Sequence, residues 1–425
     1  MTSSAIGRRW LTLFTLAWLV IWMAQLTPLQ LLLPLQLDEQ TADDGDRWIH
    51  SVVVSGMILG IGGLVGVIAG PLAGAGSDRT DGSHFPAWLG ARRRIWALGG
   101  SWGMAIFLVA TGVAHRPWLV ATCWIGVSAA VAVASAAFTA MIPDQLPPQQ
   151  RGGASAAIGS SQALGIVLGV GTIVVLGLDV VPGYLVLAAL VAVVGTAAAF
   201  GLPDPAPPHT DAVSPDRQRW ASLRDRDFCW MLGGRLVGNI GNALGTSLFL
   251  FFLLYGLGQE TDAAENNLLI LIVVYTVFTV GSSVVFGLVA DRRGHRRLLT
   301  VVAAGIQACA GLVIVAHTTF ATTVVAAALM GVGYGAFMTA GLAFATDLLP
   351  YHHDHGRDLG IVNVSAALGQ LIGPMLGAGL VAAVGGFWLV FVAGSVLSVA
   401  GAAMTLGARE KHPDTTSSTP PLPAP

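Results

Sequence analysis

Long apolar segments follow one another along almost the whole of this chain. They begin near residues 10, 48, 95, 117, 153 and 181 in the first half, and near 228, 267, 298, 319, 358 and 386 in the second. A helix needs about 20 apolar residues to cross a bilayer core. Charged residues make up only 10% of the chain, too few to cover a soluble protein with a polar surface. The pattern therefore predicts an all-α integral membrane protein with twelve transmembrane helices.

The basic residues fall almost entirely on one side of the predicted helices. Of the 21 Lys and Arg residues, 18 lie in the N-terminal segment, the connections that follow even-numbered helices, or the C-terminal tail. The opposite connections hold only Arg47 and Arg116, and Arg235 lies within a span. Basic loops stay on the cytoplasmic side, so a cytoplasmic-membrane protein with both termini inside is predicted. This one-sided distribution favours a topological role over nucleic-acid binding.

A Pro-rich, charged stretch separates the sixth predicted helix from the seventh. Such a composition is typical of a linker between two units. The last residues are poor in hydrophobic side chains, as in disordered tails. We therefore predict an N-terminal six-helix bundle (1–203), a cytoplasmic linker (204–227), a C-terminal six-helix bundle (228–408) and a disordered cytoplasmic tail (409–425).

The two halves share two features at matching positions. The loop after the second helix reads GAGSDR from Gly74 in the first half and GLVADRRGHRR from Gly287 in the second. After the fourth helix of each half comes an Asp-x-Leu-Pro stretch, at Asp144 and at Asp347. Parallel repeats joined by a linker are a recognised plan for secondary transporters. The repeat therefore predicts two pseudo-symmetric bundles.

The loop that starts at Gly287 matches the GxxxDRxGxRR motif of the major facilitator superfamily, and the chain resembles this family over about residues 8–408. The interrupted SDR…GARRR form of the first loop is more weakly similar to the glycoside and sucrose symporter branch. The resemblance implies an alternating-access carrier whose halves rock about a central site. We expect a monomer in the lipid bilayer that binds a small-molecule substrate, without nucleic acid and without a cofactor.

Charged residues of the repeated loops are candidates for a conformational switch. An Asp at a helix end can pair with a nearby Arg or cap the positive end of a neighbouring helix. Contacts of this kind form in one rocking state and break in the other. The alternative is that these charges only orient the loops. The candidates are Asp78, Arg79, Asp144, Asp291, Arg292, Arg296 and Asp347.

Polar residues within the spans are candidates to line a substrate site. Arg235, Asn239 and Asn242 fall on one stripe of the seventh helix, and an Arg in a cavity favours an anionic or hydroxyl-rich solute. Trp22 and Gln25 share a face of the first helix. The alternatives are interior packing, helix–helix hydrogen bonds and, for Arg235, a side chain that snorkels to the interface. The full set of candidates is Trp22, Gln25, Gln162, Arg235, Asn239, Asn242, Asn363 and Gln370.

Several other chemistries are disfavoured by the sequence. The only lysine is Lys411 in the tail, which excludes a phosphate-binding GxxxxGK[ST] loop. The Tyr-His-His-Asp-His run over 351–355 has a spacing that fits no familiar metal site, so no metal is predicted. No Asp, Glu or His lies near the middle of a span, so proton coupling would have to use outer residues such as Asp38, Glu39 or His50.

The favoured function is secondary transport of a small organic solute, sugar-like or an organic anion, by symport or uniport. The fifth helix lacks the Gly-Pro motif that is usual in drug–proton antiporters of the similar family. Efflux of drugs or metabolites is therefore the alternative within the same class. A non-transporting membrane sensor or a polytopic membrane enzyme is the alternative from another class. A sensor would need a large soluble domain and an enzyme a cluster of catalytic side chains, and the sequence shows neither.

Overall fold

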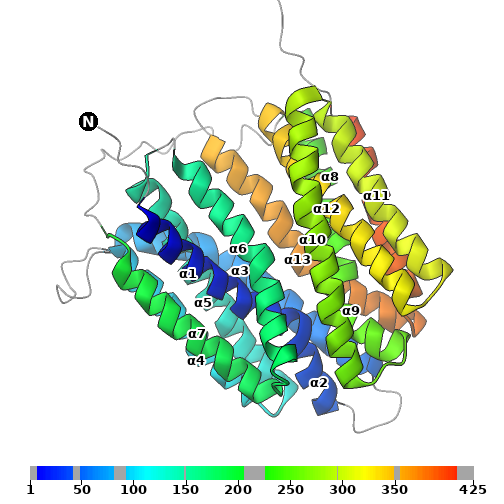
Figure 1. Cartoon of the computed structure of the whole chain (residues 1–425), viewed down its shortest axis with the longest axis horizontal. Coiled ribbons are helices and arrows are strands. Elements are labelled where there is room, and N and C mark those ends of the chain that lie inside the picture. Colours follow the sequence, from blue (N-terminus) through cyan, green and yellow to red (C-terminus); the bar gives the residue numbers. More distant parts are fainter. Residues whose placement is uncertain are drawn as a thin grey trace, which may run out of the picture.

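The structure is a computed structural model that describes residues 7–41, 48–80, 92–147, 150–204, 225–293, 295–348 and 355–408. Every regular element in these ranges is a helix. Figure 1 shows the helices as two neighbouring groups, with most of those of the first half on the left and most of those of the second half on the right. The elements of the first half are α1 (Arg8–Thr27), η1 (Pro28–Leu32), α2 (Leu33–Thr41), α3 (Trp48–Arg79), α4 (Arg92–Gly112), α5 (Pro117–Gln145), α6 (Arg151–Val175) and α7 (Val180–Gly201).

The second half repeats this order after the linker. Its seventh span is built from three consecutive elements, as the first span is, and each contains a short π-helical turn. The elements are α8 (Arg226–Thr246), α9 (Phe249–Phe251), η6 (Phe252–Gly256), α10 (Thr261–Arg293), α11 (Arg296–Ala316), α12 (Phe320–Leu348), α13 (His355–Val384) and α14 (Trp388–Gly407).

The prediction of twelve spans is confirmed, because 12 helices of the described chain are long and apolar enough to cross a membrane. Most begin within a few residues of the predicted positions. The eighth is an exception, since α10 begins at Thr261 and its first turns carry Asp262 and Glu265. Acidic residues stabilise the positive N-terminal end of a helix, so this polar stretch is helical where the sequence predicted a loop up to about residue 267.

Local signals explain how several helices begin and end. Asp225 caps α8, because its Oδ1 accepts hydrogen bonds from the backbone N–H groups of Asp227 (2.9 Å) and Phe228 (3.2 Å). Gly177 and Gly385 follow α6 and α13 with φ of 59° and 64°. Residues with side chains rarely adopt this left-handed conformation, so glycine is the usual residue at such a helix end.

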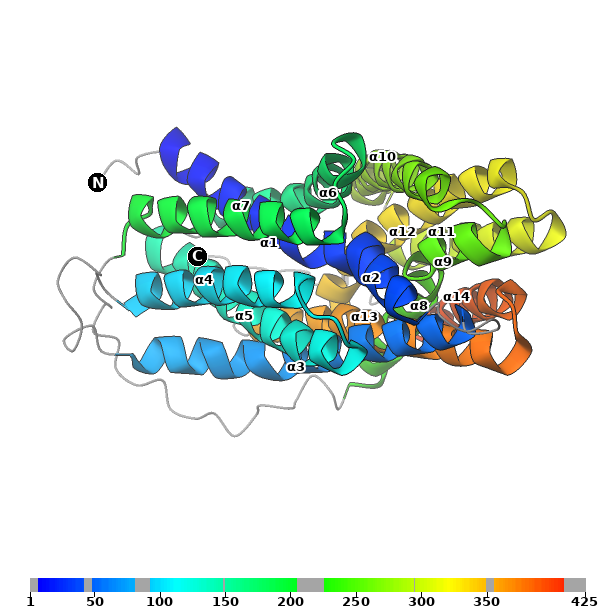
Figure 2. The same cartoon turned by 90° about the horizontal axis from the view of Figure 1, so that it is seen from below.

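Each half packs mainly within itself. In the first half α4 packs on α5 and α7, and α1 packs on α6 and α7; in the second half α12 packs on α10 and α11, and α14 packs on α8 and α11. The halves meet chiefly through α3 against α13 and α6 against α10, and Figure 2 shows α3 and α13 lying next to each other. Residues 205–224 and 409–425 lie outside the described ranges, so the four-part division of the chain stays a prediction.

Candidate functional site

One face of α3 contacts the other half over only part of its length. A Cβ atom on Gly56 would lie 2.4 Å from the Ala378 Cβ, and one on Gly63 would lie 3.0 Å from the Leu371 Cα, both in α13. Gly70 and Gly74 lie on the same face by helical periodicity, but a Cβ there would meet no atom of the described residues within 4 Å. Among the glycines of this face, close contact with the described part of the other half is therefore confined to the first half of α3.

The closed part of this interface lies on one side of the molecule. Because the number of spans is even, α1 begins and α14 ends on the same side, here called the terminal side; the opposite side is called the distal side. The chain of α3 runs from the distal side at Trp48 to the terminal side at Arg79. The halves therefore pack closely on the distal side, whereas none of the residues whose side chains are described approaches Gly70 or Gly74 on the α3 face toward the terminal side.

Polar and aromatic contacts hold the distal side closed. The Tyr255 hydroxyl in η6 donates to the Asp38 carboxylate in α2, with O···O distances of 2.6 and 2.7 Å to the two carboxylate oxygens. The Trp48 ring stacks on Tyr255 at 5.2 Å and on Phe387 at 5.5 Å between ring centroids. The hydrogen bond and the two ring contacts each join the first half to the second, so together they form a latch between the halves.

The second half contains a cluster of polar side chains within its bundle. Asn242 Nδ2 donates to the Tyr275 hydroxyl at 3.2 Å, and Gln307 Nε2 donates to Asn242 Oδ1 at 3.2 Å. The Tyr275 and Tyr334 rings lie 6.2 Å apart. Asn239 Nδ2 donates to the backbone oxygen of Arg235 at 2.9 Å. The cluster joins α8, α10, α11 and α12, and it includes Asn239 and Asn242 from the predicted stripe.

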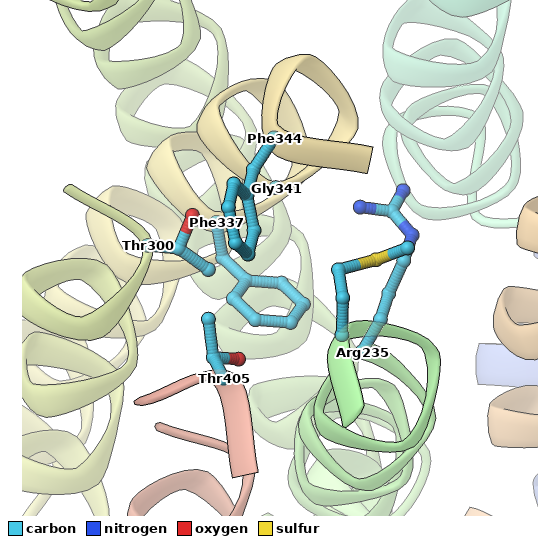
Figure 3. Close-up of a pocket in the computed structure, with 7 residues that line it drawn as sticks. Arg235, Thr300, Phe337, Gly341, Phe344 and Thr405 are labelled. Carbon is cyan, nitrogen blue, oxygen red and sulfur yellow. The ribbon is translucent and has the colours of Figure 1, made fainter. Parts of the chain in front are cut away.

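Arg235 is the charged member of this cluster. Its side chain is buried, with 3% of its surface exposed. It borders a cavity of about 10 Å³, room for about one water molecule. The other residues that line this cavity are Met231, Thr300, Phe337, Gly341, Phe344 and Thr405. In Figure 3 the guanidinium group points away from Thr300, Phe337 and Thr405.

The arginine has almost no partner among the residues that the structure describes. Its Nη2 contacts the Met338 sulfur at 3.3 Å, and its Nε and Nη1 have no hydrogen-bond partner among these residues. A buried guanidinium normally binds carboxylates or several oxygen acceptors. A single thioether sulfur is a weak acceptor, so Arg235 can still bind an acceptor that is not part of the chain.

The other substrate-site candidates lie apart from this cluster. Trp22 and Gln25 are half-buried in α1, where the Trp22 ring is tilted against that of Trp18, with 6.0 Å between ring centroids, and Trp22 packs on Gly165 of α6. Gln162 is exposed on α6. Gln370 is exposed on α13, between the neighbouring residues Gly369 and Leu371, which contact α8 and α3 respectively. The Asn363 side chain lies outside the part of the chain that the structure describes.

Two switch candidates of the first half meet on one arginine at the terminal side. Arg93 Nη2 pairs with Asp78 Oδ1 at 2.7 Å, and Arg93 Nε donates to Asp144 Oδ2 at 2.8 Å. Its third nitrogen, Nη1, donates to Ser77 Oγ at 2.8 Å. These contacts join α3, α4 and α5 within one half. Arg79 is exposed and belongs to none of them.

The matching group of the second half is only partly described. Arg292 is exposed and Arg296 half-buried, while the side chains of Asp291 and Asp347 lie outside the described residues. Arg93 and Asp144 are 51 residues apart, and the numbering gives the same separation for Arg296 and Asp347. We therefore expect Arg296 to hold the place of Arg93, and the switch role of both groups stays a prediction. The 351–355 run also falls outside the described side chains, and no group that could hold a metal occurs among those described.

Sequence reasoning missed two residues that the structure makes central. Arg93 belongs to the basic run of the repeated loop, and nothing in the sequence distinguishes it from Arg92 and Arg94. Gln307 is the one amide of α11, in an otherwise apolar stretch. A lone amide within a transmembrane helix usually finds a hydrogen-bond partner across the bundle, and this signal could have identified Gln307.

Comparison with known proteins gives the family and the fold. The model of the Major Facilitator Superfamily matches residues 82–258 and 235–425. No curated protein matches significantly. The crystal structure of a bacterial homologue of the human lysosomal transporter Spinster, in an inward-facing and unoccupied conformation, is similar with a TM-score of 0.74 at 14% identity, covering 95% of this chain and 98% of that one. A mutant of the nucleoside transporter NupG is similar with a TM-score of 0.71 at 14% identity, covering 93% and 98%. This chain is a multi-pass membrane protein and belongs to the major facilitator superfamily of transporters.

Proposed function

We propose that this protein is a secondary transporter that moves a small organic solute, sugar-like or an organic anion, across the cytoplasmic membrane by alternating access. Both termini are cytoplasmic in this proposal, so the terminal side faces the cytoplasm. The solute binds between the halves, and the protein alternates between a state open to the terminal side and a state open to the distal side.

The observation that carries the proposal is the unequal contact along α3. Gly56 and Gly63 pack against α13, while a Cβ on Gly70 or Gly74 of the same face would meet none of the described residues within 4 Å. Glycines at the open positions leave a smooth surface on which α13 could pack if the halves rocked the other way. The latch between Tyr255 and Asp38 supports the same reading, because it must break when the distal side opens.

Two leucine wedges test alternating access. Gly56→Leu places its side chain against the Ala378 Cβ and the Pro374 carbonyl oxygen, so it should force the distal side open. Gly74→Leu has free space here, but it should prevent the terminal side from closing. Both variants should fold and lose uptake of a labelled panel of sugars and organic anions into proteoliposomes.

The two wedges should have opposite effects on access from the terminal side. The reporter is a cysteine in place of Gly70, in a background without Cys123, Cys229 and Cys309, treated with a membrane-impermeant maleimide. Labelling should fall several-fold with Gly56→Leu and stay at the parent level or rise with Gly74→Leu. Equal labelling in both variants, together with full uptake, would refute alternating access about this interface.

A further inference from the structure

We infer that Arg235 binds an anionic group of the transported solute, a carboxylate or a phosphate. This inference rests on the proposed function and narrows its substrate class. Its basis is the environment of the Arg235 side chain. The residue is 3% exposed, two of its nitrogens have no partner among the described residues, and the third contacts a thioether sulfur.

The position of Arg235 argues against a snorkelling side chain. Arg235 lies nine residues after the first residue of α8, which is roughly 14 Å along the helix at about 1.5 Å per residue. A snorkelling arginine buries its stem and keeps its charged end in water. Here the whole side chain is buried, and Nε and Nη1 reach neither the surface nor a hydrogen-bond acceptor of the described residues.

The charge selects the kind of ligand. Placing a cation in a low-dielectric interior costs several kcal/mol unless an opposite charge lies close to it. A hydroxyl-rich neutral solute could accept hydrogen bonds from Arg235 but would leave its charge uncompensated. A carboxylate or phosphate compensates the charge of Arg235 and also satisfies its hydrogen bonds, because its oxygens can accept two parallel N–H bonds from the planar guanidinium. Of the two solute classes proposed above, the structure therefore favours the anion.

The surroundings of the guanidinium leave it free to exchange partners. A Cβ on Gly341 would lie 3.1 Å from Nη1. A larger residue at this position would therefore crowd the guanidinium. The adjoining cavity of about 10 Å³ is too small for an organic anion. Binding therefore requires the guanidinium to leave the Met338 sulfur, or α8 and α12 to separate. Neither movement breaks a strong hydrogen bond of Arg235.

Equilibrium binding to the purified full-length protein tests the inference. The anionic probes are benzoate, succinate and glycerol 3-phosphate, and the neutral probes are benzamide and glycerol. At least one anion should raise the unfolding temperature of the wild-type protein, as a ligand of the native state does. Comparison of succinate with glycerol 3-phosphate distinguishes a carboxylate from a phosphate ligand.

The decisive variant is Arg235→Met. It should weaken binding of that anion at least 100-fold while its unfolding temperature without ligand stays equal to or above that of the wild type, because an uncompensated buried charge has been removed. Gly341→Ala crowds Nη1 without altering the charge and should weaken binding about tenfold. If Arg235→Met does not fold, Arg235→Gln is measured with the same criterion for binding.

The outcomes separate this inference from the proposed function. Wild-type affinity for the anion in Arg235→Met or Arg235→Gln would overturn it. Stabilisation of the wild type by none of the anionic probes would also overturn it, and uptake of a neutral solute would then still support transport. Anion binding that depends on Arg235, without any uptake into proteoliposomes, would support the binding site and contradict the proposed function.

Discussion

Arg93 and Arg235 are two arginines with the same burial and opposite surroundings. Arg93 is 5% exposed and Arg235 is 3% exposed. At the terminal side of the first half, Arg93 shares its three nitrogens among Asp78, Asp144 and Ser77. Inside the second half, the one hydrogen-bond acceptor of Arg235 in the described part of the chain is the Met338 sulfur. Burial alone therefore does not distinguish a structural arginine from one that is available for a ligand. The hydrogen-bond partners of the arginine within the protein do.

The difference extends to the two bundle interiors. In the first half, the inward face of α1 carries an aromatic ladder in which Trp10 stacks on Phe14 at 4.7 Å and Trp18 lies 6.0 Å from Trp22. In the second half, the corresponding first helix, α8, carries Arg235 and two asparagines. The halves share a fold, but the first helix of the first half presents aromatic side chains, whereas the first helix of the second half presents polar ones.

The largest effect is expected from removing the paired arginine. Arg93→Met leaves the carboxylates of Asp78 and Asp144 without the guanidinium they share, and breaking a buried ion pair from one side costs about 3 kcal/mol or more. The unfolding temperature of the purified protein should fall clearly, whereas that of Arg235→Met should not. If both variants lost stability equally, the two arginines would have the same structural role and the comparison would fail.

A smaller effect is expected from the two carboxylates, and it should differ between them. The Asp144 side chain is 20% exposed and that of Asp78 is 62% exposed. Charge-assisted hydrogen bonds are stronger away from water, so Asp144→Asn should cost about 2 kcal/mol and Asp78→Asn less than about 1 kcal/mol. Thermal unfolding of both variants measures this order. A larger loss of stability for Asp78→Asn than for Asp144→Asn would show that solvent exposure does not determine how much each carboxylate contributes.

The smallest effect is expected in the polar cluster of the second half. Gln307→Met removes one hydrogen bond to Asn242 Oδ1, which can still accept from the Tyr275 hydroxyl at 3.4 Å. We expect a loss below about 1 kcal/mol. Gln36→Met in the first half removes bonds to the backbone oxygens of Thr111 (2.7 Å) and Ala114 (3.1 Å) and should cost more. The reverse order in thermal unfolding would mean that the second-half cluster is a stability element.

The sequence predicted the spans well because their signal is local. Length and hydropathy mark each of the twelve helices, and the stripe of Arg235, Asn239 and Asn242 follows from helical periodicity alone. What could not be predicted depends on distant segments. Arg93 was not distinguished from its basic neighbours because its partner Asp144 lies 51 residues away. The start of α10 was misplaced because a polar first turn weakens the hydropathy signal.

The glycine contacts of α3 also give this helix the mechanics of a lever. Gly63 is the last glycine of α3 that the described part of α13 approaches closely, and it lies 15 residues from Trp48 and 16 residues from Arg79. At about 1.5 Å per residue each arm is roughly 23 Å long. A rigid helix that turned about this point would move its two ends by equal and opposite amounts while its centre stayed still. In the proposed alternating access, one such rotation would open one side as it closed the other and would move a solute bound near Gly63 least.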